Sequence, residues 1–572
     1  MAKELCSGLQ EDAGSTIKMA RWWLWMPLLL GVGLYCLGLK WTDLWTPDEP
    51  RYAEVAREML QRDDYVQPYC NGEKYTEKPP LFFWMVAALA KLRGEVDQLA
   101  VRLPSAASAV GTLALLIWFC ARFFGRREAF VAGLVLCTSP QFFWLARSGH
   151  IDMLLTFLIT ASLVSFYRFY CGGGWWYGAV FYGCLALATL AKGPVGMLLP
   201  LLAVACFAAL SGDWRAVKRL RPALGLPAVA AVVMLWYIPA MGQASGYDPG
   251  SMVLRQIIGR MFHPTSHSVS IFYWPFYHAT VLAYGMAPWS LLLPFAAAEA
   301  YRARRDKSQT PRLFLLCWSG AIFAFFTLIA SKRELYILPM YPAAAALAGI
   351  WLTRSQTRAS FRMPRLATAA YGTALVCLGL SALTVLPGWL AKACPDLPTG
   401  VARTLLPLCA PAGAIAIAAA FFCSRRTHVI AACASASVVL FAVLIIGVLP
   451  WVNTWKSPQA ICSVFASCRE ADSELGMYGR ARTEYVFYAQ CHIHPIAGVA
   501  ELRRFFDTDR RMFCFIAEKH FGVTRAEADF PMHVLARRFV SSRTMLLVCN
   551  QPAAPLGEAA LAAKKAGPWV DD

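Results

Sequence analysis

The sequence predicts a mainly α-helical membrane protein that ends in a small α/β domain. Of its 572 residues, 58% are hydrophobic and 16% are charged, and the mean hydropathy is +0.46. This composition lies well outside the range of ordinary soluble domains. The apolar residues gather in long runs, and roughly twenty are needed for one helical span, so we expect about thirteen transmembrane helices. We place these helices in residues 1–450 and a separate soluble domain in residues 451–572.

The predicted spans follow from the apolar runs along the chain. One further apolar segment, residues 81–92, is too short to cross a bilayer, so we expect an interfacial or re-entrant helix there. The predicted spans cover residues 22–40, 99–119, 129–146, 153–170, 176–191, 195–210, 223–240, 276–298, 313–330, 335–353, 366–388, 403–423 and 428–450.

The formal net charge of +19 comes from short basic clusters between these apolar runs. This distribution follows the positive-inside rule, and it argues against a nucleic-acid partner. All of these clusters fall on one side of the membrane, which the rule assigns to the cytoplasm. The loops 41–98 and 241–275 and the C-terminal domain are then expected on the outer side. The clusters lie at residues 122–127, 215–221, 302–307, 354–365 and 425–426.

Residues 451–572 alternate short apolar strands with helical patterns, which predicts a small α/β domain. Residues 551–572 look like a flexible tail. Some of the domain's five cysteines would pair in an oxidising compartment, and an odd number leaves at least one unpaired. The patterned segments are 474–478, 483–490, 499–506, 512–516 and 545–548, and the cysteines are Cys462, Cys468, Cys491, Cys514 and Cys549.

Asp48 and Glu49 directly follow the first apolar run. Residues 47–60 have helical spacing of apolar side chains, so both acids lie at the start of a short predicted helix. A carboxylate there gains about 0.3–1 kcal/mol from the helix dipole. Asp48 therefore either caps this helix or serves a reaction at the membrane surface. We expect Glu49 to support the helix start.

Other polar motifs interrupt the apolar runs on the same outer side. Glu77 and Lys78 precede two prolines that fix an extended turn, and they either face a site, pair with each other or anchor the interface. Arg147 and Asp152 share a short link between two spans, and they either face a cavity or pair with each other. Lys192 is a cation on the side that the charge rule disfavours.

Lys332 and Arg333 are likewise cations on the disfavoured side, and such cations suggest an anionic ligand such as phosphate. Snorkelling at helix ends is the alternative explanation. The long loop adds His263 and His267 before an aromatic run. A histidine from this loop together with Glu77 would suit zinc or manganese, while an aromatic interface belt is the alternative for the loop.

Five motifs together resemble the polyprenyl-phosphate-sugar glycosyltransferases of the GT-C architecture, in particular the aminoarabinose transferases of lipid A modification, which are related to the protein mannosyltransferases. The resemblance covers about the first 350 residues, with the motifs in the expected order. The motifs are Asp-Glu-Pro-Arg-Tyr-Ala-Glu at 48–54, Tyr-Thr-Glu-Lys-Pro-Pro-Leu-Phe-Phe-Trp at 75–84, Arg-Leu-Pro-Ser at 102–105, Lys-Gly-Pro at 192–194 and Ser-Lys-Arg-Glu-Leu-Tyr-Ile-Leu-Pro at 331–339.

The resemblance implies a GT-C fold in a bacterial inner membrane, with the site and the C-terminal domain in the periplasm. It also implies inverting transfer of a sugar, aminoarabinose being the first choice, from undecaprenyl phosphate to a lipid or glycan acceptor, without a nucleotide. Asp48 would be the catalytic carboxylate, with Asp152 as the second acid. Lys78 and Arg51 would hold the donor phosphate, and Glu77 would bind a divalent metal with His267 or, as second choice, His263. The substrate cavity would be lined by Tyr52, Tyr75, Arg147, Lys192, Lys332 and Tyr336.

Two other functions stay open at this point. The same donor class would also serve transfer to another envelope glycan or to protein hydroxyls. A transporter for a lipid-linked saccharide would also need an outward cationic cavity, but inverted repeats and ionisable groups near the middle of the membrane are expected for it. Here the charges gather at one face and no repeat is visible. The oligomeric state is not indicated by the sequence.

Overall fold

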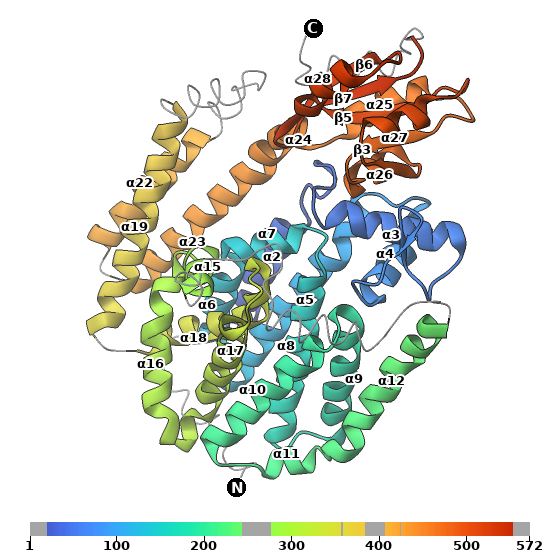
Figure 1. Cartoon of the computed structure of the whole chain (residues 1–572). Helices are drawn as coiled ribbons and strands as arrows, with labels where there is room; N and C mark the ends of the chain where they lie inside the picture. The colour runs from blue at the N-terminus through green and yellow to red at the C-terminus, as the bar shows by residue number, and fades with distance from the viewer. Residues whose placement is uncertain (1–19, 243–275, 356–357, 384–405, 424, 553–572) are drawn as a thin grey trace.

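The computed structural model is a bundle of helices with a small sheet domain at one end (Figure 1). It describes residues 20–242, 276–355, 358–383, 406–423 and 425–552. Within these ranges, seven helices are long and apolar enough to cross a membrane, or nine if two bent helix pairs each form one span. The predicted mainly helical membrane protein is therefore confirmed. The number of about thirteen spans stays a prediction.

Each predicted span overlaps a described helix, but two of the spans are strongly bent. The halves of one meet at 67° and those of the other at 117°, and a membrane tolerates such breaks where neighbouring helices satisfy the backbone. The bent spans are α6 (Arg126–Cys137) with α7 (Pro140–Arg147), and α15 (Tyr277–Gly285) with η4 (Trp289–Leu292), α16 (Leu293–Arg302) and η5 (Ala303–Arg305).

The remaining helices of the bundle include three that carry a short 3₁₀ segment at one end and a fourth that contains a π segment. In chain order they are η1 (Arg21–Leu24) with α2 (Trp25–Cys36), α5 (Gln98–Phe123), α8 (Ile151–Tyr170), α9 (Trp175–Lys192), α10 (Val195–Ser211), α12 (Pro222–Gly242), α17 (Thr310–Leu328), η7 (Glu334–Met340) with α18 (Tyr341–Arg354), α19 (Arg358–Leu383), η8 (Leu406–Leu408) with α22 (Cys409–Phe422), and α23 (Arg426–Val443), which continues through η9 (Leu444–Val448) into α24 (Leu449–Lys456).

The centre of the bundle is α18, which is buried on all sides together with η7. Its alanine-rich sequence allows close packing on α6. At Gly349, an added Cβ would come within 2.7 Å of the Ala132 backbone nitrogen. Small residues at helix contacts let membrane helices approach closely where the hydrophobic effect gives little driving force. This packing fixes the start of η7, and with it the preceding Arg333, at the end of the bundle where the first loop lies.

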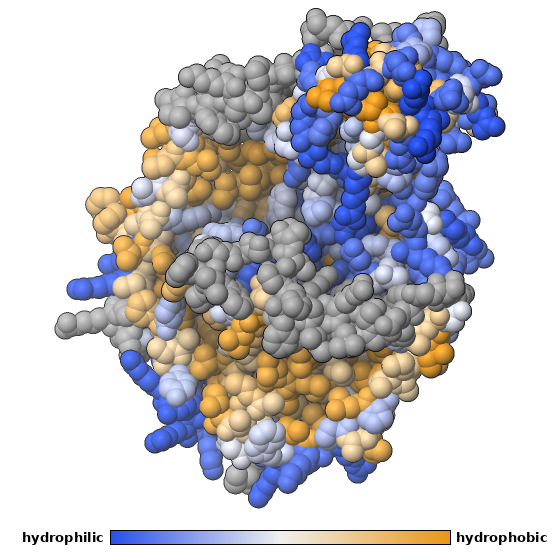
Figure 2. Space-filling view, viewed as in Figure 1, coloured by the Kyte–Doolittle hydropathy of each residue, from blue (hydrophilic) through white to orange (hydrophobic). Residues whose placement is uncertain are grey.

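The surface separates into a hydrophobic band and two polar ends (Figure 2). One polar end carries the basic clusters, which lie on the short helix α11 (Arg215–Arg219) and after α16. The first loop and the C-terminal domain lie at the opposite end. This arrangement of apolar helices between polar ends is that of a multi-pass membrane protein.

The first loop contains two helices and a short hairpin between them. The predicted helices at 47–60 and 81–92 are confirmed as α3 (Glu49–Arg62) and α4 (Leu81–Arg93), and β1 (Tyr69–Cys70) pairs antiparallel with β2 (Glu73–Lys74). The apolar face of α3 packs on α4, where the Tyr52 ring contacts the rings of Phe82 and Phe83. Most of the other predicted loop, residues 241–275, lies outside the described residues.

The C-terminal domain is the predicted α/β unit, built on a five-stranded sheet of order β4-β3-β5-β7-β6. β3 pairs parallel with β4 and β5, whereas β7 pairs antiparallel with β5 and β6. The sequence patterns missed two strands, β4 and β6. The five cysteines of this domain are all free thiols in the structure. The elements are α25 (Gln459–Cys468), β3 (Leu475–Tyr478), α26 (Thr483–Ala489), β4 (Ile493–Ile496), α27 (Val499–Phe506), β5 (Phe513–Ala517), α28 (Glu518–Glu527), β6 (His533–Val540) and β7 (Arg543–Cys549).

This domain docks on the first loop through hydrogen bonds to backbone atoms. Asn71 of the hairpin exchanges two bonds of 2.9 Å with the backbone of Ile493. Arg57 of α3 donates to the Phe487 carbonyl at 3.0 Å, near the end of α26. The Leu44 amide donates to the Tyr488 hydroxyl at 2.6 Å. The C-terminal domain thus covers the loop that carries Asp48.

Glu49 forms a buried ion pair with Arg102 of α5, which corrects the expectation that it only supports the helix start. Both side chains are 5% exposed, and the closest N–O distance is 2.7 Å. The Glu49 carboxylate also accepts from the amides of Trp45 at 2.9 Å and Gly149 at 2.8 Å. Burial alone would raise the pKa of Glu49, but Arg102 and these amides hold it below its usual range.

The Arg102 guanidinium donates in turn to the carbonyls of Leu39, Thr42 and Asp43, at 2.6–2.8 Å. One ion pair therefore ties together the end of the first span, the start of α3, the helix α5 and the link between α7 and α8. These are the segments that surround Asp48.

Replacing Glu49 with Gln should strongly destabilise the protein, because Arg102 would keep its charge in a buried site without a countercharge. We expect a loss of about 3 kcal/mol or more, measured as a lower unfolding temperature in detergent. The control is Arg503→Gln, which breaks a pair with Asp529 in which both side chains are about 60% exposed and which should change stability by less than about 1 kcal/mol. Equal unfolding temperatures for the two variants would contradict the structural role of the pair.

Candidate active site

Asp48 lies directly before α3, but its side chain makes no capping hydrogen bond to that helix. The helix-cap alternative is therefore wrong. Its carboxylate instead accepts from Nη2 of Arg333 at 2.9 Å, and His150 Nδ1 lies 3.7 Å from the same oxygen. The Asp48 side chain is 6% exposed and that of Arg333 is 29% exposed. A buried acid thus faces a cation that solvent and ligands can still reach.

The surrounding cations keep Asp48 in its ionised form. Burial alone would raise the pKa of the carboxyl group, but the nearby His150 and the charges of Arg333 and Arg51 outweigh this effect and lower the pKa below its usual value. Arg333 is affected in the opposite way: burial would lower its pKa, but Asp48 and Asp152 raise it. The pair therefore remains a carboxylate and a guanidinium across the physiological range.

Arg51 and Glu77 form a second pair beside Asp48. Arg51 Nη1 lies 3.3 Å from Glu77 Oε2, and the Tyr75 hydroxyl lies 3.5 Å from the same oxygen. The positive charge of Arg51 also reaches Asp48. These predicted site residues therefore gather at the start of α3, and Lys78 is buried shortly before α4.

Asp152 and Lys192 form a third pair, between the start of α8 and the end of α9. The Lys192 ammonium also lies 4.7 Å from the centre of the Tyr336 ring. This lysine and this acid were both predicted as site residues, and the structure brings them together. The alternative Arg147–Asp152 pair is not formed, because Asp152 faces Lys192 instead.

Two side chains that were predicted to bind the substrate, those of Arg147 and Lys332, contact backbone carbonyls. Arg147 is buried and donates to the Leu34 carbonyl at 2.7 Å, on the side of the loop where the Glu49–Arg102 pair lies. The Lys332 ammonium donates to the carbonyls of Phe326 and Thr327, at 3.0 and 2.7 Å. Lysines often satisfy the last carbonyls of a helix in this way, so Lys332 caps α17, and the neighbouring Arg333 faces Asp48.

The sequence interpretation missed His150. It named Arg333 among the cations that suggest an anionic ligand, but it chose Lys332 for the substrate cavity. Arg333 belongs to the same Ser-Lys-Arg motif as Lys332, but it lies 285 residues from Asp48 in the chain. Only the fold decides which of two adjacent cations faces the acid. His150 lies in the short polar link before α8, where the sequence drew attention to Arg147 and Asp152 instead.

The predicted metal site is described only in part. Glu77 is half-exposed and shares its carboxylate with Arg51, whereas His263 and His267 lie outside the described residues. Within the described ranges, no group of three or more histidine, cysteine, aspartate or glutamate side chains is placed to hold a metal ion. Metal binding by Glu77 and a loop histidine stays a prediction.

This arrangement suits an anionic ligand beside an ionised acid. Arg51, Arg333 and Lys192 supply positive charge within one region at the end of the bundle where the first loop lies, and Asp48 stays charged among them. Arginines bind phosphate through several fixed donors, and lysines bind it as point charges. A carboxylate in such a place can orient or deprotonate an acceptor while the cations neutralise a phosphate.

Comparisons with known proteins show which proteins this chain is similar to. Residues 77–238 match a family described as dolichyl-phosphate-mannose-protein mannosyltransferase. An undecaprenyl phosphate-alpha-4-amino-4-deoxy-L-arabinose arabinosyl transferase from Aeromonas salmonicida is 28% identical over 65% of this chain and 67% of its own. Another so described, from Pectobacterium carotovorum, is 29% identical over 57% of this chain and 58% of its own.

The crystal structure of ArnT from Cupriavidus metallidurans bound to undecaprenyl phosphate has the same fold. The TM-score is 0.78 at 21% identity, over 94% of this chain and 100% of that one. The chain is therefore similar in sequence to these glycosyltransferases, and it shares the fold of this solved structure. The predicted GT-C fold is thereby confirmed. The aligned sequence spans roughly three fifths of the Pectobacterium relative, so that the likeness in sequence does not extend over its whole length.

Replacing Arg333 with Gln should shift the acid limb of the pH profile of this protein to higher pH. Asp48 must be ionised to act, and the variant removes a charge that lowers its pKa while the burial that raises it remains. The measurement is kcat/KM for sugar transfer from a polyprenyl-phosphate donor against pH, because it reports the free enzyme.

Arg333→Lys is the matched control for this shift, because it keeps a positive charge near the acid. We expect its acid limb to stay close to that of the unchanged protein. An acid limb that does not move in Arg333→Gln would contradict the coupling between Arg333 and Asp48.

Proposed function

We propose that this protein transfers a sugar from a polyprenyl-phosphate donor to an acceptor at the outer face of the membrane. The observation that carries the proposal is the ionised Asp48 held by Arg333 and flanked by Arg51, on a GT-C fold. Relatives described as undecaprenyl phosphate-aminoarabinose transferases support undecaprenyl phosphate as the carrier and aminoarabinose as the sugar. The proposed orientation is that of the positive-inside rule, with the site in the periplasm of a bacterial inner membrane.

The donor in this reaction is already activated, because a polyprenyl phosphate leaves readily once its charge is neutralised. Arg51 and Lys78 are proposed to hold that phosphate, and Arg333 and Lys192 add positive charge nearby. No nucleotide is needed for this step. The sugar carbon is attacked from the face opposite to the leaving phosphate, which gives inversion in a single displacement.

Asp48 is proposed to face the acceptor. If the acceptor is a lipid phosphate, our first choice being lipid A, it arrives ionised and Asp48 mainly orients it. If the acceptor is a hydroxyl group, Asp48 takes its proton as a general base. The match of residues 77–238 to protein mannosyltransferases keeps a hydroxyl acceptor on an envelope glycan or a protein as the second candidate. Asp152, paired with Lys192, is the proposed second acid.

Replacing Asp48 with Asn should lower the rate of sugar transfer by at least about a hundredfold, because the charge that orients or deprotonates the acceptor is lost. Stabilisation of the protein by undecaprenyl phosphate should persist. The measurements are a transfer assay with purified protein and thermal unfolding with and without undecaprenyl phosphate.

The matched control for this prediction is Asp63→Asn, the same change in the same loop. Asp63 is exposed and has a φ of 51°, a backbone conformation that asparagine adopts readily. We expect normal transfer from this variant. Near-normal turnover of Asp48→Asn would refute the role of Asp48.

A divalent ion is proposed at Glu77, with His267 as first and His263 as second partner. Such an ion would supply positive charge next to the donor phosphate. Zinc and manganese both accept this pair of ligand types.

Metal content is the direct test of this site. Purified protein should contain zinc or manganese in measurable amount. The double variant His267→Ala with His263→Ala should lose this metal, and the single variant Glu77→Gln should lose it too. His494→Ala in the C-terminal domain is the control and should leave it unchanged. Purified unchanged protein without bound zinc or manganese, even after incubation with either ion, would contradict the proposal.

A further inference from the structure

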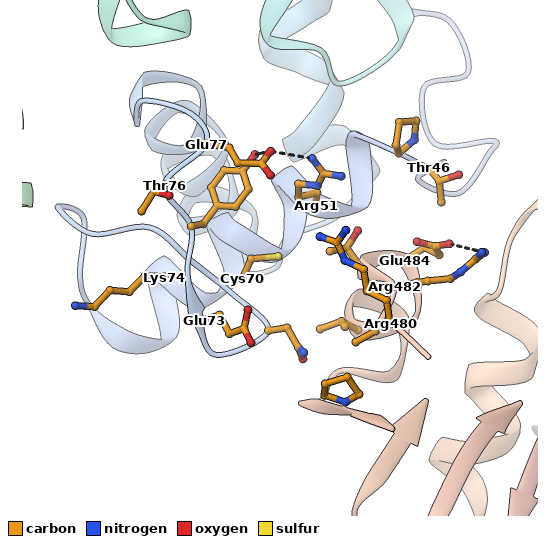
Figure 3. Close-up of a pocket in the computed structure, with 17 residues that line it drawn as sticks. Thr46, Arg51, Cys70, Glu73, Lys74, Thr76, Glu77, Arg480, Arg482 and Glu484 are labelled. Atoms are coloured by element: carbon orange, nitrogen blue, oxygen red, sulfur yellow. Dashed lines mark hydrogen bonds and ion pairs between the residues drawn. The ribbon is translucent and has the colours of Figure 1, made fainter. Parts of the chain in front are cut away.

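A pocket of about 520 Å³ lies between the first loop and the C-terminal domain (Figure 3). One wall comes from the start of α3 and from the β1–β2 hairpin with the residues after it. The other wall comes from the residues before α26, from the first turn of that helix and from β4. The size is within the range of pockets that hold small ligands, and the lining includes Thr46, Arg51, Glu77, Arg480, Arg482 and Glu484.

The pocket adjoins the candidate active site. Thr46, Pro47 and Arg51 line it, and these residues flank Asp48 in the chain. The charge of Arg51 acts on Asp48 on one side and on Glu484 of the C-terminal wall on the other. A molecule that occupies the pocket therefore contacts Arg51, whose charge acts on Asp48.

Arg51 and Arg480 point toward each other from the two walls of the pocket, whereas the Arg482 side chain points toward Glu484 (Figure 3). Arg51 is paired with Glu77 at 3.3 Å, and Arg482 lies 3.7 Å from Glu484. The structure gives Arg480 no hydrogen bond or ion pair with any described residue, and its side chain is exposed. Like charges on facing walls repel unless an anion lies between them.

We propose that this pocket binds the acceptor through an anionic group that does not react, such as a phosphate on a saccharide headgroup, with Arg480 as its principal contact and Arg482 as its second. This inference rests on the proposed transfer reaction and names the acceptor's binding site. The donor approaches from the membrane through its polyprenyl chain, whereas this pocket lies outside the bundle, between two water-soluble parts. Binding energy from a distant group of a substrate positions the reacting end, which here lies at Asp48.

The test is Arg480→Gln in the full-length protein, assayed for transfer with the acceptor concentration varied. The loss of a charge-assisted contact should raise the KM for a phosphorylated acceptor about 10-fold to 100-fold. The turnover at saturating acceptor and the affinity for undecaprenyl phosphate should be unchanged. Arg480→Lys should recover part of the affinity. Arg504→Gln is the matched control, because Arg504 is an exposed arginine of the same domain outside the pocket.

A direct binding measurement separates this inference from the transfer reaction. The probes are the soluble bisphosphorylated glucosamine disaccharide, and phosphatidylcholine vesicles that carry lipid A with or without its phosphates. Phosphate-dependent binding that Arg480→Gln weakens supports the pocket even if no sugar is transferred. If only the vesicles show this phosphate-dependent binding, the pocket recognises an anion carried by a lipid. If the soluble disaccharide also shows it, the phosphate on the saccharide is sufficient for binding. An unchanged acceptor KM and unchanged binding in Arg480→Gln, or a weaker affinity for undecaprenyl phosphate, would overturn the inference.

Discussion

The buried pair of Glu49 and Arg102 is the interaction on which the outer face of this protein depends. The first loop has a charged and polar sequence, and it would lie loosely on a membrane surface without an anchor. Arg102 reaches from α5 to Glu49 and to three loop carbonyls. A buried ion pair needs this complete set of hydrogen bonds to offset the loss of hydration. Its geometry fixes the start of α3, and so it fixes the position of Asp48.

The adjacent acids Asp48 and Glu49 therefore have different tasks because their side chains leave the helix start in different directions. Glu49 faces the bundle and is fully enclosed, whereas Asp48 faces Arg333 at the edge of the accessible region. The cations around Asp48 keep it ionised in spite of its burial. A reaction with a preactivated donor requires little more from the protein than a neutralised phosphate and an oriented acceptor. This site has cations for the phosphate and a carboxylate for the acceptor.

Much of the fold could be predicted from the sequence, because membrane helices and amphipathic helices have strong local patterns. The patterned segment 499–506 has the bounds of α27, and the predicted first-loop helices lie within two residues of their observed bounds. The strands β4 and β6 were missed. The polar His494 within β4 and the two arginines within β6 break the apolar run that marks a strand, and their pairing in the sheet compensates for this weak local pattern.

The acids of the candidate site could be predicted from the sequence, whereas its cations could be predicted only in part. Asp48 stands out because a carboxylate beside a membrane span is costly. The choice of Arg333 over Lys332, and the task of Glu49, depend on contacts between segments far apart in the chain. Sequence alone does not give those contacts. The same holds for the pocket that contains Arg480, because it exists only where the C-terminal domain docks on the first loop.

The most direct test of the central claim is an experimental structure of the protein with undecaprenyl phosphate bound. The claim is that the cations around Asp48 form the phosphate site. The account predicts phosphate density in contact with Arg51 or Lys78, near the Asp48–Arg333 pair, at the outer end of the bundle. Phosphate density at the opposite end, for example near Arg219 and Arg221, would contradict it.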